Sequence, residues 1–160
     1  TVLQAVARAY VHLLRDLEFD RIAALPYAAL PIGTAVSLLM DKPLIYPRKE
    51  ARTHGTGLTV EGRHEPGERV VVLDDVITTG GSKIAALTPL QEAGLTVEDV
   101  VVLIDRGQGG AMELAARGLS LHAALRLSDM LDVLAQAGRI TSQQRREILA
   151  FLEASRRGSG

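Results

Sequence analysis

The chain has 160 residues, of which 47% are hydrophobic and 23% charged, and its formal net charge at pH 7 is -1. A chain of this length can bury roughly 68–70% of the surface that it exposes when unfolded, so we expect one domain with a sizeable core. The composition excludes a disordered or fibrous protein, and the near-zero charge gives no sign of nucleic-acid binding. Cysteine is absent, which excludes disulfides, thiolate metal sites and cysteine nucleophiles.

No stretch of the sequence has the pattern of a membrane span. Charged or polar residues interrupt every apolar run before the roughly 20 residues that a bilayer-spanning helix requires. The amino terminus also lacks the basic and then apolar pattern of a signal peptide. We therefore expect a cytoplasmic protein that binds neither a membrane nor nucleic acid.

The predicted elements alternate between helices and strands. Apolar residues at three- and four-residue spacing predict an amphipathic helix over residues 1–18. Its apolar face consists of Leu3, Val6, Tyr10, Leu13, Leu14 and Leu17. Runs of β-branched residues or leucine predict strands near residues 21–25, 43–47, 69–73, 99–104 and 119–127.

Two of the predicted strands, at 70–73 and 100–104, are continuously apolar, as expected for parallel strands covered on both faces. Between them we expect a helix over 82–93 that is closed by Gly94 and is kinked or shortened by Pro89. This alternation predicts an α/β fold with a mostly parallel central sheet flanked by helices. Ligands of such sheets bind at the carboxyl ends of the strands, so the site is expected in the loops that follow strands.

The carboxyl-terminal part of the chain is predicted to form two helices. Ser128 is a candidate N-cap for a helix that ends at Gly138. Thr141 and Gln144 form a capping-box pattern that opens a second helix, which runs to about Ala154.

The sequence contains no segment that would divide it into two domains. We therefore predict one domain over residues 1–155 and a disordered tail over 156–160. His12, His64 and His122 show no ligand spacing with one another or with paired acids, so no tight structural metal site is predicted.

An acidic doublet follows the strand predicted at 69–73. Asp74 and Asp75 are adjacent, and two carboxylates at one strand end repel each other unless they meet cations or polyhydroxyl groups. The small and hydroxyl residues at 78–82 would let backbone N–H groups at a helix amino terminus face a phosphate. Together these features predict a site for a phosphorylated ribose. The alternative is a polar turn in which Ser82 caps the helix, and this alternative leaves the paired acids unexplained.

The glycines at 81 and at 107–110 do not fit two known nucleotide-binding patterns. The Gly-Ser-Lys sequence at 81–83 has the wrong order and spacing for a P-loop. The glycines at 107–110 lack the later glycine of the dinucleotide fingerprint and follow the last large strand, whereas the fingerprint follows the first.

Residues 71–82 resemble the phosphoribosyl pyrophosphate motif of the type I phosphoribosyltransferases. Three further segments, in the same order along the chain, are similar to orotate phosphoribosyltransferases: residues 26–31, residues 46–55 and the pair 105–106. The resemblance runs from about residue 5 to residue 135 and looks closest to the domains that are fused to orotidylate decarboxylase in some bacteria and eukaryotes. It also implies a further segment that covers the base, so the domain is predicted to be short at its amino terminus.

The resemblance implies a magnesium-dependent transferase of pyrimidine synthesis. Such an enzyme moves the 5-phosphoribosyl group from phosphoribosyl pyrophosphate to orotate and releases orotidine 5'-phosphate and pyrophosphate. Asp74 and the implied catalytic residue Asp75 would hold the ribose hydroxyls and lie near a Mg²⁺ that is bound mainly through the substrate. The segment implied to bind the sugar phosphate consists of Val76, Ile77, Thr78, Thr79, Gly80, Gly81 and Ser82.

A basic segment is implied to be a mobile catalytic loop that closes over the pyrophosphate and partly reaches the partner subunit's site, which implies a homodimer. Its substrate-binding residues are Arg48, Lys49, Arg52 and His54, and the last three are implied to be catalytic. The cations suit an anionic ligand, and the glycines at 55 and 57 provide hinge freedom. Taken without the resemblance, the segment also fits a solvated basic surface loop.

The resemblance assigns the remaining contacts to two further strand ends. Arg106 would pair with the orotate carboxylate, because a planar guanidinium fork matches a carboxylate, and a structural salt bridge is the alternative. Tyr27 and Ala28 lie in the segment that binds pyrophosphate in the family, although many members have a lysine where Ala28 stands.

Two other functions share the ribose-phosphate motif and remain alternatives at this stage. One is a salvage phosphoribosyltransferase for a purine base. The other is a non-catalytic regulator that binds phosphoribosyl pyrophosphate or nucleotides. The near-neutral charge and the basic loop argue against this second alternative.

Overall fold

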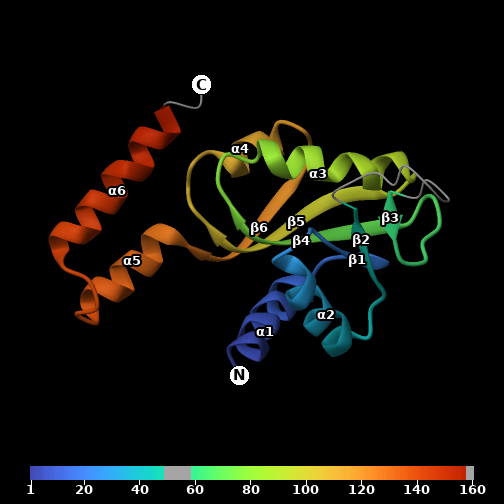
Figure 1. Cartoon of the computed structure of the whole chain (residues 1–160), viewed down its shortest axis with the longest axis horizontal. Helices are drawn as coiled ribbons and strands as arrows, with labels where there is room; N and C mark the ends of the chain where they lie inside the picture. The colour runs from blue at the N-terminus through green and yellow to red at the C-terminus, as the bar shows by residue number, and fades with distance from the viewer. Residues whose placement is uncertain (49–58, 158–160) are drawn as a thin grey trace.

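The computed structural model describes residues 1–48 and 59–157 and has a six-stranded sheet at its centre (Figure 1). The strands are β1 (Arg21–Ala24), β2 (Leu44–Pro47), β3 (Val60–Glu61), β4 (Arg69–Ile77), β5 (Thr96–Asp105) and β6 (Ser120–Arg126). Their order across the sheet is β3-β2-β1-β4-β5-β6. Every pairing is parallel except that of β2 with the short β3, so the predicted α/β class with a mostly parallel sheet is confirmed.

Helices cover both faces of the sheet and one end (Figure 1). The helices are α1 (Val2–Leu14), α2 (Ala29–Met40), α3 (Gly81–Glu92), α4 (Gly110–Ala115), α5 (Leu127–Gln136) and α6 (Ser142–Arg157). Helices α1 and α2 pack on one face, and α3 and α4 lie over the other. Figure 1 shows α5 and α6 beyond the edge at which the parallel strands end.

The strand β4 divides the core into two clusters. Its side chains alternate, so Val70 and Val72 pack with Leu87 and Leu90 of α3, whereas Val71 and Leu73 pack on the opposite face against α1. These valines and leucines are nearly or fully buried, and each buried side chain of this size contributes roughly 1.5–3 kcal/mol. The continuous apolar run therefore has the two-sided burial that the sequence predicts.

The first helix is shorter than predicted. It ends at Leu14, whereas the periodicity suggests residue 18, and Leu3 is exposed although it was assigned to the apolar face. The chain must turn toward β1 after Leu14, and Leu17 contacts the core from that turn. The side chain of Thr1 caps the helix through the N–H of Gln4.

The elements around the acidic doublet also differ from the prediction. Strand β4 extends to Ile77 because it continues to pair with β5, where Ile77 lies opposite Asp105. Helix α3 begins at Gly81 and continues for three residues past Pro89, so the proline does not end it there. The two-residue strand β3 has no apolar run long enough to be recognised in the sequence.

The carboxyl-terminal helices confirm one predicted cap and correct another. Helix α5 begins at Leu127, and Ser128 lies inside it, donating its hydroxyl to Asp129 instead of capping the helix. The capping box of Thr141 and Gln144 is present at the start of α6. Helix α6 continues to Arg157 and thus includes the first two residues of the predicted tail, whereas residues 158–160 lie outside the described chain.

None of the helices in the described parts of the chain is both long and apolar enough to span a bilayer.

The contact between α4 and the end of β4 yields a test of the packing. A Cβ added to Gly110 would lie 2.6 Å from Cγ1 of Ile77 and 2.7 Å from the carbonyl oxygen of Thr78. We expect Gly110→Ala to lower the free energy of unfolding by about 1–3 kcal/mol, because the backbone must shift to relieve this overlap. Urea denaturation measures the change.

Gly81→Ala is the matched control, because nothing lies within 4 Å of a Cβ at that position. Alanine is a better helix former than glycine by about 1 kcal/mol, so the control should be as stable as the parent or slightly more stable. Equal stabilities for the two variants would contradict the packing described here.

Candidate active site

The acidic doublet lies at the centre of the sheet, near the end of β4. Ile77 belongs to the same core cluster as Val72 although the two residues are five positions apart, so the strict alternation of β4 breaks between them. The side chains of Asp74 and Asp75 occupy this irregular segment, and each accepts the N–H of the residue that follows it, at 2.9 and 2.8 Å. The strand thus orients both carboxylates through its own backbone.

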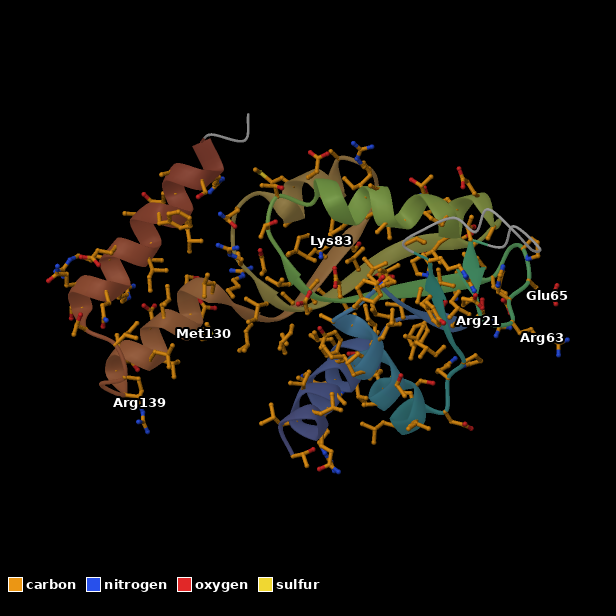
Figure 2. All side chains as sticks on the ribbon, in the orientation of Figure 1. Arg21, Arg63, Glu65, Lys83, Met130 and Arg139 are labelled. Atoms are coloured by element: carbon orange, nitrogen blue, oxygen red, sulfur yellow. The ribbon has the colours of Figure 1, made fainter. Side chains whose placement is uncertain are left out.

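Asp74 is almost completely buried and has three partners. Its Oδ2 forms an ion pair with Nζ of Lys83 in the first turn of α3, and its Oδ1 accepts the N–H of Asp75. Its backbone carbonyl accepts the hydroxyl of Tyr10, which reaches it from α1 at 2.5 Å. Figure 2 shows Lys83 between α3 and the sheet. Helices from both faces of the sheet therefore fix the position of Asp74.

The burial of this cluster affects its protonation. Burial raises the pKa of Asp74 because the charged form loses solvation, while the ammonium of Lys83 acts in the opposite direction. Burial also raises the pKa of Tyr10, and the nearby charge of Asp74 adds to this effect. Tyr10 therefore stays a neutral hydroxyl that can donate to the Asp74 carbonyl.

Asp75 is only half-buried and is the more accessible acid of the doublet. Its Oδ1 accepts the N–H of Val76, and its side chain also interacts with the neighbouring carboxyl group of Asp74. Asp75 is thus the more accessible acid to a ligand because it is only half-buried, whereas Asp74 is buried and both of its oxygens have partners within the protein.

The turn after β4 leads into α3 and presents backbone N–H groups. Gly80 has φ +91°, and a Cβ there would also meet Gly110 at 3.3 Å, so the turn requires glycine. Within the described chain, the N–H groups of Thr79, Gly80 and Gly81 make no backbone hydrogen bond. Unpaired N–H groups at a helix amino terminus favour an anion such as phosphate.

The segment that follows β5 holds this turn through two backbone hydrogen bonds. The N–H of Gly110, at the start of α4, donates to the carbonyl of Thr78 at 2.9 Å. The N–H of Arg106 donates to the carbonyl of Ile77 at 3.1 Å. The segment after β5 and the turn after β4 are therefore joined through their backbones.

Arg106 follows the last residue of β5, as the sequence predicts. It lines a cavity of about 240 Å³ at the carboxyl edge of the sheet, and it makes no ion pair with another described residue. The alternative that Arg106 belongs to a structural salt bridge therefore finds no support in the described parts of the chain.

The predicted residues at the ends of β1 and β2 line two other cavities. Arg48 lines both, together with Asp74 and Lys83 in a cavity of about 400 Å³ and with Tyr27 in one of about 280 Å³. A guanidinium nitrogen of Arg48 pairs with Glu61, whereas its buried Nε has no partner among the described atoms. The peptide bond between Pro26 and Tyr27 is cis, and Ala28 stands at the N-cap of α2.

The structure thus brings Arg48 next to the acidic doublet and Arg106 next to the turn. Lys49, Arg52 and His54 lie outside the described residues. Tyr27 is largely exposed at the mouth of its cavity.

Sequence reasoning missed two residues that organise this site. In the sequence, Lys83 belongs to a segment that fails the P-loop pattern, although a lysine eight residues after an acidic doublet can indicate an ion pair. Tyr10 was assigned to the apolar face of the first helix, and nothing in the sequence links its hydroxyl to a residue 64 positions away.

The described residues offer no ready-made metal cage. They contain no cluster of three or more histidine or acidic side chains that could hold a metal ion. The half-buried carboxylate of Asp75 suits a hard cation such as Mg²⁺, which commonly takes one or two carboxylates and completes its shell with water and substrate phosphates.

Comparison with known proteins identifies the family to which the chain belongs. The profile of the family described as phosphoribosyl transferase domain matches residues 1–127. The bifunctional enzyme PyrF/PyrE of Nostoc sp. is 43% identical over 89% of this chain, which covers 30% of that protein. The orotate phosphoribosyltransferase of Methanothermobacter thermautotrophicus is 43% identical over 80% of this chain and 70% of the relative.

A solved structure gives the same result. The UMP synthase of Leishmania donovani superimposes with a TM-score of 0.89 and 43% sequence identity, over 96% of this chain and 33% of that protein. The chain therefore spans about a third of the length of these fused relatives. The family match, the sequence identity and the shared fold all agree, and the chain belongs to the phosphoribosyl transferase domain family, among its orotate phosphoribosyltransferases.

Proposed function

We propose that this chain transfers a 5-phosphoribosyl group from phosphoribosyl pyrophosphate to orotate. The reaction forms a bond between the anomeric carbon and a ring nitrogen of orotate and breaks the bond from that carbon to the pyrophosphate oxygen. The leaving group departs with the bonding electrons, and the products are orotidine 5'-phosphate and pyrophosphate. The enzyme must hold the ribose, neutralise the leaving group and exclude water from the anomeric carbon.

One observation carries this proposal, namely the half-buried carboxylate of Asp75 directly before a turn whose N–H groups are unpaired within the described chain. A carboxylate accepts hydrogen bonds from ribose hydroxyls, and the N–H groups of residues 79–82 donate hydrogen bonds to a phosphate. The two groups are four to seven residues apart on one turn, as a sugar and its own phosphate require. The hydroxyls of Thr78, Thr79 and Ser82 belong to the same proposed phosphate site.

The two acids have different roles in this proposal. Asp75 has an accessible oxygen and acts directly on the ribose, as a proposed catalytic residue. Asp74 is buried, and both of its oxygens are bound within the protein. It therefore contributes negative charge near the ligand and holds the backbone of the doublet in place.

Mg²⁺ is the proposed cofactor and would be held mainly by the diphosphate of the substrate, with Asp75 and Asp74 nearby. When bound, it neutralises the charge that develops on the leaving pyrophosphate. Arg48, Lys49, Arg52 and His54 are the proposed cations of the loop that closes over the diphosphate. Tyr27 and Ala28 form the other proposed wall of the diphosphate site.

The orientation of the base depends on Arg106 in this proposal. Its guanidinium lines the cavity at the end of β5 and is free of ion pairs with described residues. Orotate carries a carboxylate that a guanidinium fork binds in a planar, two-point geometry. Purine bases lack this carboxylate, so Arg106 favours the pyrimidine acid.

We further propose that the chain acts in the cytoplasm as a homodimer. The absence of cysteine fits a reducing compartment, and the resemblance to enzymes with a shared catalytic loop supports the dimer. Val2 of α1 and Leu38 and Leu39 of α2 are exposed apolar residues of the kind that a subunit interface covers.

Asp75→Asn tests the role of the accessible carboxylate. The substitution removes the negative charge that attracts the ribose hydroxyls and Mg²⁺, so we expect the affinity for phosphoribosyl pyrophosphate to fall by about tenfold or more. Isothermal titration calorimetry with Mg²⁺ measures the change. The exposed Asp16→Asn is the charge-matched control, and equal affinities for both variants would remove Asp75 from the site.

Base competition tests the assignment to orotate. Purified chain with Mg²⁺ and phosphoribosyl pyrophosphate should consume orotate, as followed by the change in its ultraviolet absorbance, and should ignore adenine and hypoxanthine. The expectation follows from Arg106, which has a carboxylate to bind only in orotate. Preferential consumption of a purine would assign the chain to base salvage instead.

Sedimentation velocity tests the proposed dimer. At micromolar concentration we expect a single species of twice the 17.1 kDa chain mass. Leu38→Lys would place a charge on the exposed end of α2 and should shift the species toward monomer. A monomer in the parent chain contradicts the proposal.

A further inference from the structure

The cavity that Arg106 lines is also lined by a second arginine, Arg126. Arg126 is the last residue of β6, and the register of the parallel strands sets it directly beside Asp105. It is therefore one residue away from Arg106 across the edge of the sheet, and both line the same cavity of about 240 Å³. Within the described chain, neither guanidinium takes part in an ion pair.

Helix α6 forms the opposite wall of this cavity. Leu149, Leu152, Glu153 and Arg156 line it, at spacings of three, one and three residues that share one helix face. The two leucines make the middle of the wall apolar. Figure 1 shows α6 on the side of the sheet where the parallel strands end.

The charges around the cavity favour an anion. Three arginines line it, at 106, 126 and 156, against two acids, Asp105 and Glu153. The Oδ1 of Asp105 accepts the N–H of Gly107 at 2.8 Å, so this carboxylate is partly neutralised by the backbone. Glu153 is exposed on α6 and is the only described acid of the cavity without such a partner.

The size and chemistry of the cavity define its ligand. Its volume lies below the roughly 300–1,000 Å³ of pockets for drug-sized molecules, so it suits one planar ring. Leucine side chains cover a ring face, and paired guanidinium groups bind a carboxylate at the ring's edge. A one-ring acid meets both conditions, whereas a two-ring purine is larger and has no carboxylate.

We infer that Arg126 is a second carboxylate-binding residue of the base site and that the face of α6 defined by Leu149 and Leu152 closes this site over the ring. The inference rests on the proposed function and adds to it a specificity residue and a wall. Arg126 and Arg106 bind the two oxygens of the carboxylate from neighbouring strand ends. Glu153 opposes the anion from the far wall and weakens its binding.

Two nucleotides isolate the carboxylate as the variable. Orotidine 5'-phosphate and uridine 5'-phosphate share the ribose, the phosphate and the pyrimidine ring, and they differ only in the carboxylate. Calorimetric titration of the full chain with each nucleotide therefore separates recognition of the carboxylate from recognition of the sugar phosphate. The parent chain should bind orotidine 5'-phosphate more tightly.

Arg126→Gln should weaken orotidine 5'-phosphate binding by about tenfold and leave uridine 5'-phosphate binding unchanged. Arg126→Lys should give an intermediate loss, because it keeps the charge without the planar fork. Glu153→Gln should strengthen orotidine 5'-phosphate binding. Arg139→Gln is the control with the same change in charge, since Figure 2 shows Arg139 at the turn between α5 and α6.

Three outcomes would overturn the inference. The first is an equal loss of affinity for both nucleotides in Arg126→Gln, which would show that the substitution acts on the structure and not on the carboxylate. The second is an affinity of the Arg126→Gln variant for orotidine 5'-phosphate that equals the affinity of the Arg139→Gln control. The third is a parent chain that binds both nucleotides equally, which leaves the proposed sugar-phosphate site intact but removes the carboxylate site. A parent chain that binds neither nucleotide nor phosphoribosyl pyrophosphate would overturn the proposed function as well.

Discussion

The burial of the Asp74 carboxylate is the constraint on which the site depends. A buried carboxylate without partners would cost several kcal/mol of desolvation, so the fold must supply a cation and hydrogen-bond donors. Lys83 provides the cation from α3, Asp75 provides an N–H from β4, and Tyr10 secures the backbone from α1. The sheet and a helix from each of its faces therefore meet at one residue, which sets the position of the neighbouring Asp75.

This arrangement explains why a doublet occurs where one acid would contact the ligand. The alternation of β4 breaks after Leu73, and the side chains of Asp74 and Asp75 separate into a buried partner of Lys83 and a more accessible acceptor. Asp74, the buried acid, holds the strand that leads into the turn, and Asp75, the more accessible acid, faces the ligand that we propose. Preorganisation of this kind removes the need to order the turn when a substrate binds.

The sequence predicts the regular parts of the fold and the location of the site, because both follow from local patterns. The apolar runs of β4 and β5 identify the buried parallel strands, and Asp74-Asp75 with the glycine turn identifies the strand end that matters. Ser128 misled the prediction of a helix start because β6 runs directly into α5, and the extended Arg126 takes the N-cap position. The partners of Asp74 escaped prediction because tertiary contacts between distant segments leave no periodic signal.

The backbone bonds between the two loops restrict how this enzyme family can change its preference for a base. Because Gly110 and Arg106 donate to the carbonyls of Thr78 and Ile77, any remodelling of residues 106–110 also displaces the turn beneath the sugar phosphate. Helix α6 has no such bond to that turn and contacts the described chain chiefly through α5. Substitutions on the face of α6 that we assign to the base site would therefore leave the turn after β4 undisturbed, so divergence in specificity should accumulate there first.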